Sequence, residues 1–288
     1  MGKRQHFVPK NEAEKRFSSH FKELAGERNP WSIWSDLMTM VAFAIANSVD
    51  QRKDVLEARE KEYLQAIGKY TTSEQGLFPT LFSDIVLALD ENPEQDFLGG
   101  LYMRLEFGDD WRAQVFTPWH VAEMMARITL GNTDELRREI CEQGYLSVFD
   151  PCCGAGVMLM ASACALKNEG INYQKQALFV GQDIDPLVAK MCYIQLSLLG
   201  CPGYVAIGDS LAKPVLGSIT NPVYDPKQIF YTPFFIMGMW GVLPPRGTGP
   251  QTLKPAKRTL PAIRPMPGTS AAAMQAVIQE ILLKRGRL

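Results

Sequence analysis

The spacing of apolar residues divides the chain into a helical first part and a later part in which strands and helices alternate. Over residues 11–110 the apolar positions recur at helical spacing, which predicts helices packed along one face. After Asn29-Pro30 the apolar residues go nearly all round, so this helix is expected to be buried. No pattern of catalytic residues accompanies these helices. We therefore expect residues 1–112 to form a helical domain for packing or partner binding.

A further helix start is expected near the end of this first part. Asn92-Pro93-Glu94-Gln95 combines a capping residue, a proline at the first helical position and a partial capping box. The apolar face that follows extends from Phe97 to Leu105, and Gly108 is expected to end the helix.

The segment after residue 112 opens with a second capped helix. Thr117 has the character of an N-cap and Pro118 that of a first helical residue. Val121, Met124, Met125 and Ile128 form the apolar face of this helix. Such a helix start offers free N–H groups to a carboxylate, although an ordinary capped helix explains the same pattern.

Strand and helix alternate between residues 146 and 211. Short apolar runs at 146–149, 177–180 and 204–207 are separated by two helical patterns, the first from Val157 to Asn168 and the second from Pro186 to Gly200. This alternation is typical of a parallel sheet with right-handed crossovers. The predicted fold is therefore α/β, preceded by the helical domain.

The first apolar run leads into a glycine turn, and each of the three runs is followed by an acid. Asp150 begins the pattern D-x-x-x-G-x-G, in which Gly154 and Gly156 let a ligand lie against bare backbone. The third glycine of the dinucleotide fingerprint is missing, which favours an adenosine ligand without a pyrophosphate. The alternative is a glycine turn that serves structure alone.

The three acids are expected to meet at one edge, because ligands of open α/β sheets bind at the carboxyl ends of the strands. Asp183 is placed to accept hydrogen bonds from two ribose hydroxyls, and Asp209 to accept one from an adenine amine. Asp150 is placed to hold an ammonium group. A single acid in such a position is more often a helix cap or a turn residue, but three in register favour a binding site.

Composition and charge indicate which classes of protein this sequence fits. The net charge is −1, so no global field attracts nucleic acid, but residues 244–288 carry eight Lys or Arg against one acid, Glu280. Seven prolines in residues 244–268 predict an extended linker, followed by a helix capped by Ser270. The six cysteines show no metal-ligand spacing, which favours free thiols in a reducing cytoplasm. No apolar run is long enough to predict a membrane span.

Four motifs in this order resemble a known family: QVFTP at 114–118, FDPCCGAG at 149–156, GQDIDP at 181–186 and GDSL at 208–211. They are similar to the gamma-type N6-adenine DNA methyltransferases, particularly the modification subunits of type I restriction systems. The resemblance implies a Rossmann-like sheet over residues 113–243 that binds S-adenosylmethionine. It also implies DNA as the substrate and a partner subunit for target recognition. The cofactor-binding residues that it implies are Phe116, Thr117, Pro118, Asp150, Gly154, Gly156, Asp183, Ile184, Asp209 and Ser210.

The catalytic motif of that family, N-P-P-Y or N-P-P-F after a fourth strand, is altered here. The nearest match, Asn221-Pro222-Val223-Tyr224, has Val for the second proline and follows a stretch, 211–220, that is no convincing strand. The resemblance implies that Asn221 and Pro222 hold the amine of a flipped adenine while Tyr224 stacks on its ring. The other candidate is Tyr231-Thr232-Pro233-Phe234, in which Thr replaces Asn. Loop turns set by proline are an alternative interpretation of both segments. The alternative to a DNA methyltransferase is therefore a binding module that has lost catalysis and assembles with nucleic-acid proteins.

Overall fold

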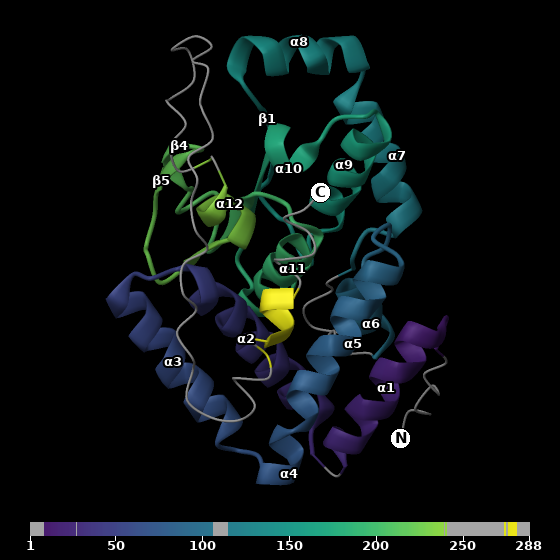
Figure 1. Ribbon diagram of the computed structural model, residues 1–288, viewed down its shortest axis with the longest axis vertical. Coiled ribbons are helices and arrows are strands. Elements are labelled where there is room, and N and C mark those ends of the chain that lie inside the picture. The colour runs from purple at the N-terminus through teal and green to yellow at the C-terminus, as the bar shows by residue number, and fades with distance from the viewer. Residues whose placement is uncertain are drawn as a thin grey trace.

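The computed structural model describes residues 9–26, 28–105, 115–238, 240, 274 and 276–280, arranged as a helical part packed beneath an α/β part (Figure 1). The helical part contains α1 (Glu12–Ala25), α2 (Pro30–Val49), α3 (Lys53–Ile67), α4 (Thr72–Gln75), α5 (Leu77–Glu91) and α6 (Phe97–Arg104). The α/β part contains α7 (Trp119–Leu130), α8 (Thr133–Gln143), β1 (Leu146–Asp150), α9 (Val157–Asn168), α10 (Tyr173–Gln176), β2 (Ala177–Asp183), α11 (Pro186–Leu199), β3 (Gly203–Ile207), β4 (Leu216–Ser218), β5 (Asn221–Val223), β6 (Ile229–Tyr231) and α12 (Pro233–Met237).

Helix α2 is the central helix of the helical part. It begins as predicted, with the Asn29 side chain accepting from the Trp31 N–H and with Pro30 in the first turn. It packs against α3 on one side and α11 on another, so its apolar surface is covered nearly all round. Its length and composition would suit a membrane span, but 78% of its most apolar window is buried inside the fold.

The helix predicted to open at Asn92 begins later. Helix α5 continues to Glu91 and Asn92 ends it with extended backbone, because the apolar face of α5 packs against α1 and α11. The next helix, α6, starts at Phe97, where the Asp96 side chain accepts from the Gly99 N–H. The prediction of a helix start at Asn92 was therefore wrong, and Asp96 is the cap.

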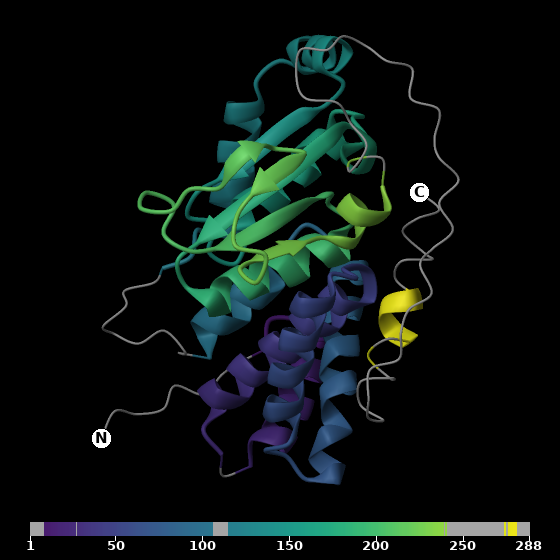
Figure 2. The same ribbon diagram turned by 90° about the vertical axis from the view of Figure 1, so that its left-hand side faces the viewer.

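The main sheet has the order β1-β2-β3-β6. The first three strands are parallel and β6 is antiparallel to β3, which confirms the predicted α/β class. Helix α9 connects β1 to β2, and α11 connects β2 to β3. Figure 2 shows α11 between the sheet and the helical part, which places α2 and the sheet on opposite sides of one helix.

The other face of the sheet carries a smaller apolar cluster. Leu178, Val180 and Tyr204 from the sheet pack there with Phe235 of α12 and with Trp240. A hairpin of β4 and β5 lies beside this cluster, so the stretch 211–220, expected to hold no strand, contains the short strand β4. The hairpin also places Asn221 inside a strand instead of after one.

Helix α7 turns its large apolar side chains outward. Met124, Met125 and Ile128 are 56%, 44% and 72% exposed, whereas Ala122 and Ala126 are buried against α9. Small side chains on this face let the two helices approach closely. Helix α7 therefore faces α9 with its alanines and not with its larger apolar side chains. Pro118 is the N-cap residue of α7, one position later than predicted.

One hydrophobic core joins the helical part to the α/β part. Residues of α2, such as Leu37 and Met40, belong to the same cluster as Ile194 of α11 and Val205 of β3. Met274 and Ile278, in a short helical stretch, are also buried in this core. The predicted linker at 244–268 and Ser270, the predicted cap of the helix that follows it, lie outside the described residues. The domain limits near residues 112 and 243 remain predictions.

Candidate cofactor site

The sheet brings the three predicted acids to one edge. Asp150 is the last residue of β1 and pairs with Gly181, while Asp183 is the last residue of β2 and pairs with Ile207. Asp209 follows β3 by two positions. We call this edge, with Asp150, Asp183 and Asp209, the cofactor edge.

The glycine turn lies beside this edge in a conformation that requires glycine. Gly154 and Gly156 have φ of 51° and 95°, in the left-handed region. A Cβ atom on Gly156 would lie 2.7 Å from Cys192 Sγ, so a larger residue would push the turn away from α11. The Gly154 N–H donates to Asp183 Oδ2 at 2.8 Å, which ties the turn after β1 to the end of β2.

Asp150 and Asp183 form the charged centre of the cofactor edge. Asp150 Oδ1 accepts from the Cys152 N–H at 3.0 Å. Burial raises the pKa of Asp150 despite that hydrogen bond, and the nearby charge of Asp183 raises it further. A cation placed beside Asp150 would stabilise the charged form that burial and the neighbouring charge oppose. The arrangement therefore suits a ligand with a positive group beside Asp150.

Asp209 and the two neighbouring positions lie at the third strand end. Asp209 Oδ1 accepts from the Leu211 and Ala212 N–H groups at 2.8 and 3.1 Å, so one oxygen already organises its own turn. Ile184, next to Asp183, is 67% exposed and offers an apolar surface at this edge. Ser210 is half-buried beside Asp209.

Phe116 is the member of the 114–118 motif that touches the turn. A Cβ atom on Gly154 would lie 3.4 Å from the Phe116 ring. That ring packs in turn on Tyr102 of α6, with ring centroids 5.5 Å apart. Thr117 is half-buried and Pro118 exposed, between Phe116 and the start of α7. Gln114 lies outside the described residues.

Tyr224 reaches the carboxyl end of β3. Its hydroxyl donates to the Ile207 carbonyl at 3.0 Å, and Lys213 Nζ lies 5.3 Å from the centre of its ring. Pro222 is half-buried in β5, and Asn221 is exposed in the same strand, with its N–H donating to Ser218 Oγ at 3.1 Å. The structure therefore brings Tyr224 beside the third strand end and leaves the Asn221 side chain on the surface of the hairpin.

The second catalytic candidate, Thr232, lies at the amino end of β3. Thr232 is fully buried, and its hydroxyl donates to the Cys201 carbonyl and accepts from the Gly203 N–H. Gly203 begins β3, whereas Asp209 follows the other end of that strand. Thr232 is thus hydrogen-bonded to sheet backbone at the end of β3 opposite Asp209, away from the cofactor edge.

Two buried glutamines near the site were not predicted from the sequence. Gln182 of β2 donates to the carbonyls of Gly208 and Lys213, which shapes the loop after β3. Gln195 of α11 is fully buried and bonds to the Ala155 carbonyl of the glycine turn. The only signal of Gln195 in the sequence is an amide among the inward apolar positions of its helix.

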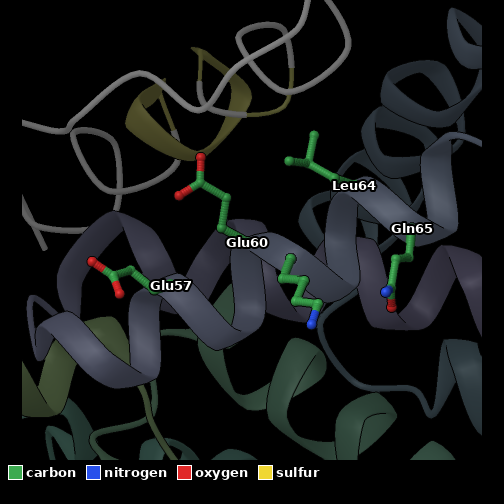
Figure 3. A pocket seen from close by; sticks show the side chains of 5 residues that line it. Glu57, Glu60, Leu64 and Gln65 are labelled. Atoms are coloured by element: carbon green, nitrogen blue, oxygen red, sulfur yellow. The ribbon is translucent and has the colours of Figure 1, made fainter.

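Two hollows in the described part of the surface lie away from the cofactor edge. Figure 3 shows one of about 450 Å³; the described residues that line it all belong to α3, among them Glu57, Glu60 and Leu64. A second, of about 220 Å³, lies between α2, α3, α11 and β6, and it is lined by Phe43, Arg59 and Lys190 among others. Neither of these two is lined by an acid of the cofactor edge.

Comparison with known proteins agrees with the motifs. Residues 107–228 match the family model of the N-6 DNA Methylase family, and this segment contains the glycine turn and all three acids. The resemblance inferred from the motifs is therefore confirmed for this segment.

Two individual proteins are also similar. A stretch of 64 residues is 34% identical to the type I restriction enzyme MjaIX methylase subunit of Methanocaldococcus jannaschii. The match covers 22% of this chain and 11% of that relative, so the chain corresponds to only a small part of it. Among solved structures, a Listeria monocytogenes protein assigned to the class I S-adenosylmethionine-dependent methyltransferases is 16% identical over 73% of this chain and 57% of its own, with a TM-score of 0.36. A likeness of that size adds nothing to the sheet order described above.

Proposed function

We propose that this chain, in which residues 107–228 match the N-6 DNA Methylase family, is an S-adenosylmethionine-dependent methyltransferase that methylates adenine N6 in DNA. The observation that carries the proposal is the cofactor edge: three carboxylates lie at the carboxyl ends of neighbouring strands beside a glycine turn, and one of them accepts a hydrogen bond from that turn. Such an edge is where open α/β sheets bind nucleotide-like ligands.

The residues present fit S-adenosylmethionine, which would supply the methyl group. Asp150 would hold its ammonium, because burial beside Asp183 makes that carboxylate favour a cation. Asp183 would accept from the ribose hydroxyls with the lone pairs that its two backbone hydrogen bonds leave free. Asp209 would accept from the adenine amine, with Ile184 as an apolar neighbour of the base.

The remaining members of the proposed cofactor site act through the backbone. Gly154 and Gly156 keep the turn free of Cβ atoms, so the ligand can approach its peptide groups. Phe116, Thr117 and Pro118 would line the methionine end, with Phe116 already against Gly154. Ser210 would complete the adenine end beside Asp209.

For the target base we assign Asn221, Pro222 and Tyr224. The Asn221 amide and the Pro222 carbonyl would orient the adenine amine, and the Tyr224 ring would stack on the base. Attack by the amine is direct, so no enzyme nucleophile is required. The Cys153 thiol is unsuited to that role in any case, because its hydrogen bond to Cys192 and its burial raise its pKa.

The second candidate function is an S-adenosylmethionine-binding module without catalysis. Two observations favour it: Val223 stands in place of the second proline, and the Tyr224 hydroxyl is held by the Ile207 carbonyl. In either function we propose DNA as the macromolecular partner, target recognition by another subunit and a cytoplasmic location. We also propose residues 1–112, 113–243 and 244–288 as the helical, cofactor-binding and C-terminal units.

A methyl-transfer assay separates the two functions. The purified chain is incubated with methyl-labelled S-adenosylmethionine and unmethylated DNA, alone and with a cognate specificity subunit, and the label is located on adenine N6. Cofactor affinity is measured by calorimetry on the same samples. An active enzyme should lose transfer in Asn221→Ala but keep cofactor binding, because this amide acts on the transition state and not on the donor.

Asn168→Ala is the matched control, since Asn168 is exposed at the end of α9 and lies outside the proposed site. Cofactor binding without any transfer would favour the binding module. Absence of cofactor binding would overturn both functions.

A further inference from the structure

The fully buried side chain of Gln195 joins the helical part of the chain to the glycine turn. Its Nε2 donates to the Ala155 carbonyl at 2.9 Å and to Asp96 Oδ1 at 2.8 Å. Its Oε1 accepts from the Leu98 N–H at 3.1 Å. Both N–H groups of the amide are therefore used, one on the turn and one on the start of α6.

The α6 side of this network is fixed independently of the turn. Asp96 caps α6 by accepting from the Gly99 N–H at 2.9 Å, and the close contact leaves no space for a Cβ atom at residue 99. Burial raises the pKa of Asp96, although the hydrogen bonds from Gln195 and Gly99 oppose that shift. Asp96 and the start of α6 therefore define where the Gln195 amide lies.

The turn side has few other means of fixing the Ala155 carbonyl. Ala155 is 2% exposed, so water does not replace a missing donor there. A buried carbonyl that loses its hydrogen bond either bears the cost of desolvation or moves, and a move would displace Gly154 and Gly156 on either side. The bond from Gln195 thus bears directly on the geometry of the turn.

A second contact from α6 reaches the same turn. Tyr102 packs on Phe116, and Phe116 lies against Gly154. One end of α6 therefore acts on Ala155 through an amide, and a later position acts on Gly154 through two aromatic rings. A network that served only to hold α6 onto α11 would need neither contact with the turn.

We propose that Gln195 is a positioning residue of the cofactor site: oriented by Asp96, it holds the Ala155 carbonyl, so that α6 sets the shape of the glycine turn and the affinity for S-adenosylmethionine. The affinity half of this inference rests on the proposed function, whereas the positioning half concerns the protein without ligand.

The test compares Gln195→Glu and Gln195→Leu in the full chain. Both substitutions have nearly the size of Gln and lack its amide donors, and Leu198→Ala, buried on the same helix, controls for lost packing. Hydrogen exchange of the Gly156 N–H, which donates to the Cys153 carbonyl, reports the turn without cofactor. Calorimetry gives the Kd for S-adenosylmethionine at pH 8 and pH 6, corrected for the folded fraction.

We expect both variants to speed exchange in the turn and to raise the Kd about tenfold at pH 8, while Leu198→Ala stays within about twofold of the wild type. In Gln195→Glu the ratio of its Kd to that of the wild type should fall towards pH 6, since a protonated Glu regains one donor. Gln195→Leu should show no such recovery. A purely structural role would not produce this difference.

Wild-type turn exchange and wild-type Kd in folded Gln195→Leu would overturn the inference. Faster exchange in the variants of a protein that binds no cofactor would retain the positioning role and overturn the proposed function. The two failures are thereby distinguishable.

Discussion

Asp183 and Gly154 are joined by a hydrogen bond of 2.8 Å from the Gly154 N–H to Asp183 Oδ2. The other oxygen, Oδ1, accepts from the Asp185 N–H at 3.0 Å, and Asp185 caps α11. One carboxylate thus fixes both the turn after β1 and the turn after β2. A residue assigned to the ribose from the sequence is also the one that assembles the site.

This double role predicts an order among the acids. Asp183→Ala should weaken binding of S-adenosylmethionine by about 10–100-fold, since donors of the protein and of the ligand both lose their acceptor at about 1–3 kcal/mol. Asp209→Ala should cost less, because Asp209 is exposed and organises only its own turn. Calorimetric titration of both variants measures the order, and a larger loss for Asp209→Ala would contradict it.

The pH dependence of cofactor binding should follow Asp150. Its pKa is raised by burial, so the carboxylate is neutralised at a higher pH than an ordinary aspartate, whose pKa is about 3.9. Because only the charged form attracts an ammonium, affinity should fall as pH decreases through that raised pKa. In Asp150→Asn the affinity should be lower at neutral pH and its decrease on acidification should vanish. Titrations from pH 8 to pH 5 would test this, and an unchanged decrease in the variant would assign it to another group.

The orientation of α7 predicts opposite responses on its two faces. Met125→Lys or Ile128→Lys should change the free energy of unfolding by no more than about 0.5 kcal/mol, since both side chains are exposed. Ala126→Leu should destabilise by about 1–3 kcal/mol, because the added atoms have no space against α9. Denaturant unfolding of the three variants measures the contrast. A large loss for both lysine variants would mean that this face is covered.

A buried ion pair links the helical part to β6. Arg59 donates to Asp50 Oδ2 at 3.0 Å and to the Ile229 carbonyl at 3.2 Å, and both charged side chains are almost fully buried. Asp50→Asn should destabilise by about 3–5 kcal/mol, because the Arg59 guanidinium would remain buried without its counter-charge. Urea unfolding measures this loss, and Asp54→Asn, an exposed position on α3, is the control.

The same ion pair predicts that the free energy of unfolding decreases at low pH. Burial alone would raise the pKa of Asp50, but the hydrogen bond from Arg52 and the charges of Arg59 and Arg52 lower it. A lowered pKa gives stability that is complete above the unfolded value of about 3.9 and is lost as pH falls through the folded value. Unfolding at pH 7 and pH 3 should show this loss in the wild type and a smaller one in Asp50→Asn.

The elements that the sequence predicted well are those with signals inside their own segment. Helix α9 has the predicted bounds, and α11 begins after Asp185 with Pro186 and ends before Gly200, as its caps indicate. The positions of the three acids at strand ends could be predicted from the apolar runs that precede them. In each case a residue and its near neighbours determine the structure, so one sequence is sufficient.

The errors concern features that distant partners decide. Asn92 and Asp96 are both good caps, and only the packing of α5 on α1 and α11 selects the second. The apolar stripe of α7 gave no sign that two alanines would face α9. The antiparallel pairing of β6 with β3 places Thr232 at the amino end of β3, and nothing within its own segment indicates that position. The role of Gln195 could not be predicted, because its partners Asp96 and Ala155 are distant from it in the sequence.

The burial of α2 has a consequence for synthesis of the chain. This helix is apolar enough to resemble a membrane segment, and α11, which covers part of it, begins only at Pro186. At about 5–20 residues per second, the ribosome needs roughly 7–27 s to make residues 50–185. During that interval α11 is not yet available to cover the side of α2 that it packs against in the folded protein. We therefore expect the nascent chain to expose this apolar surface until α11 has been made.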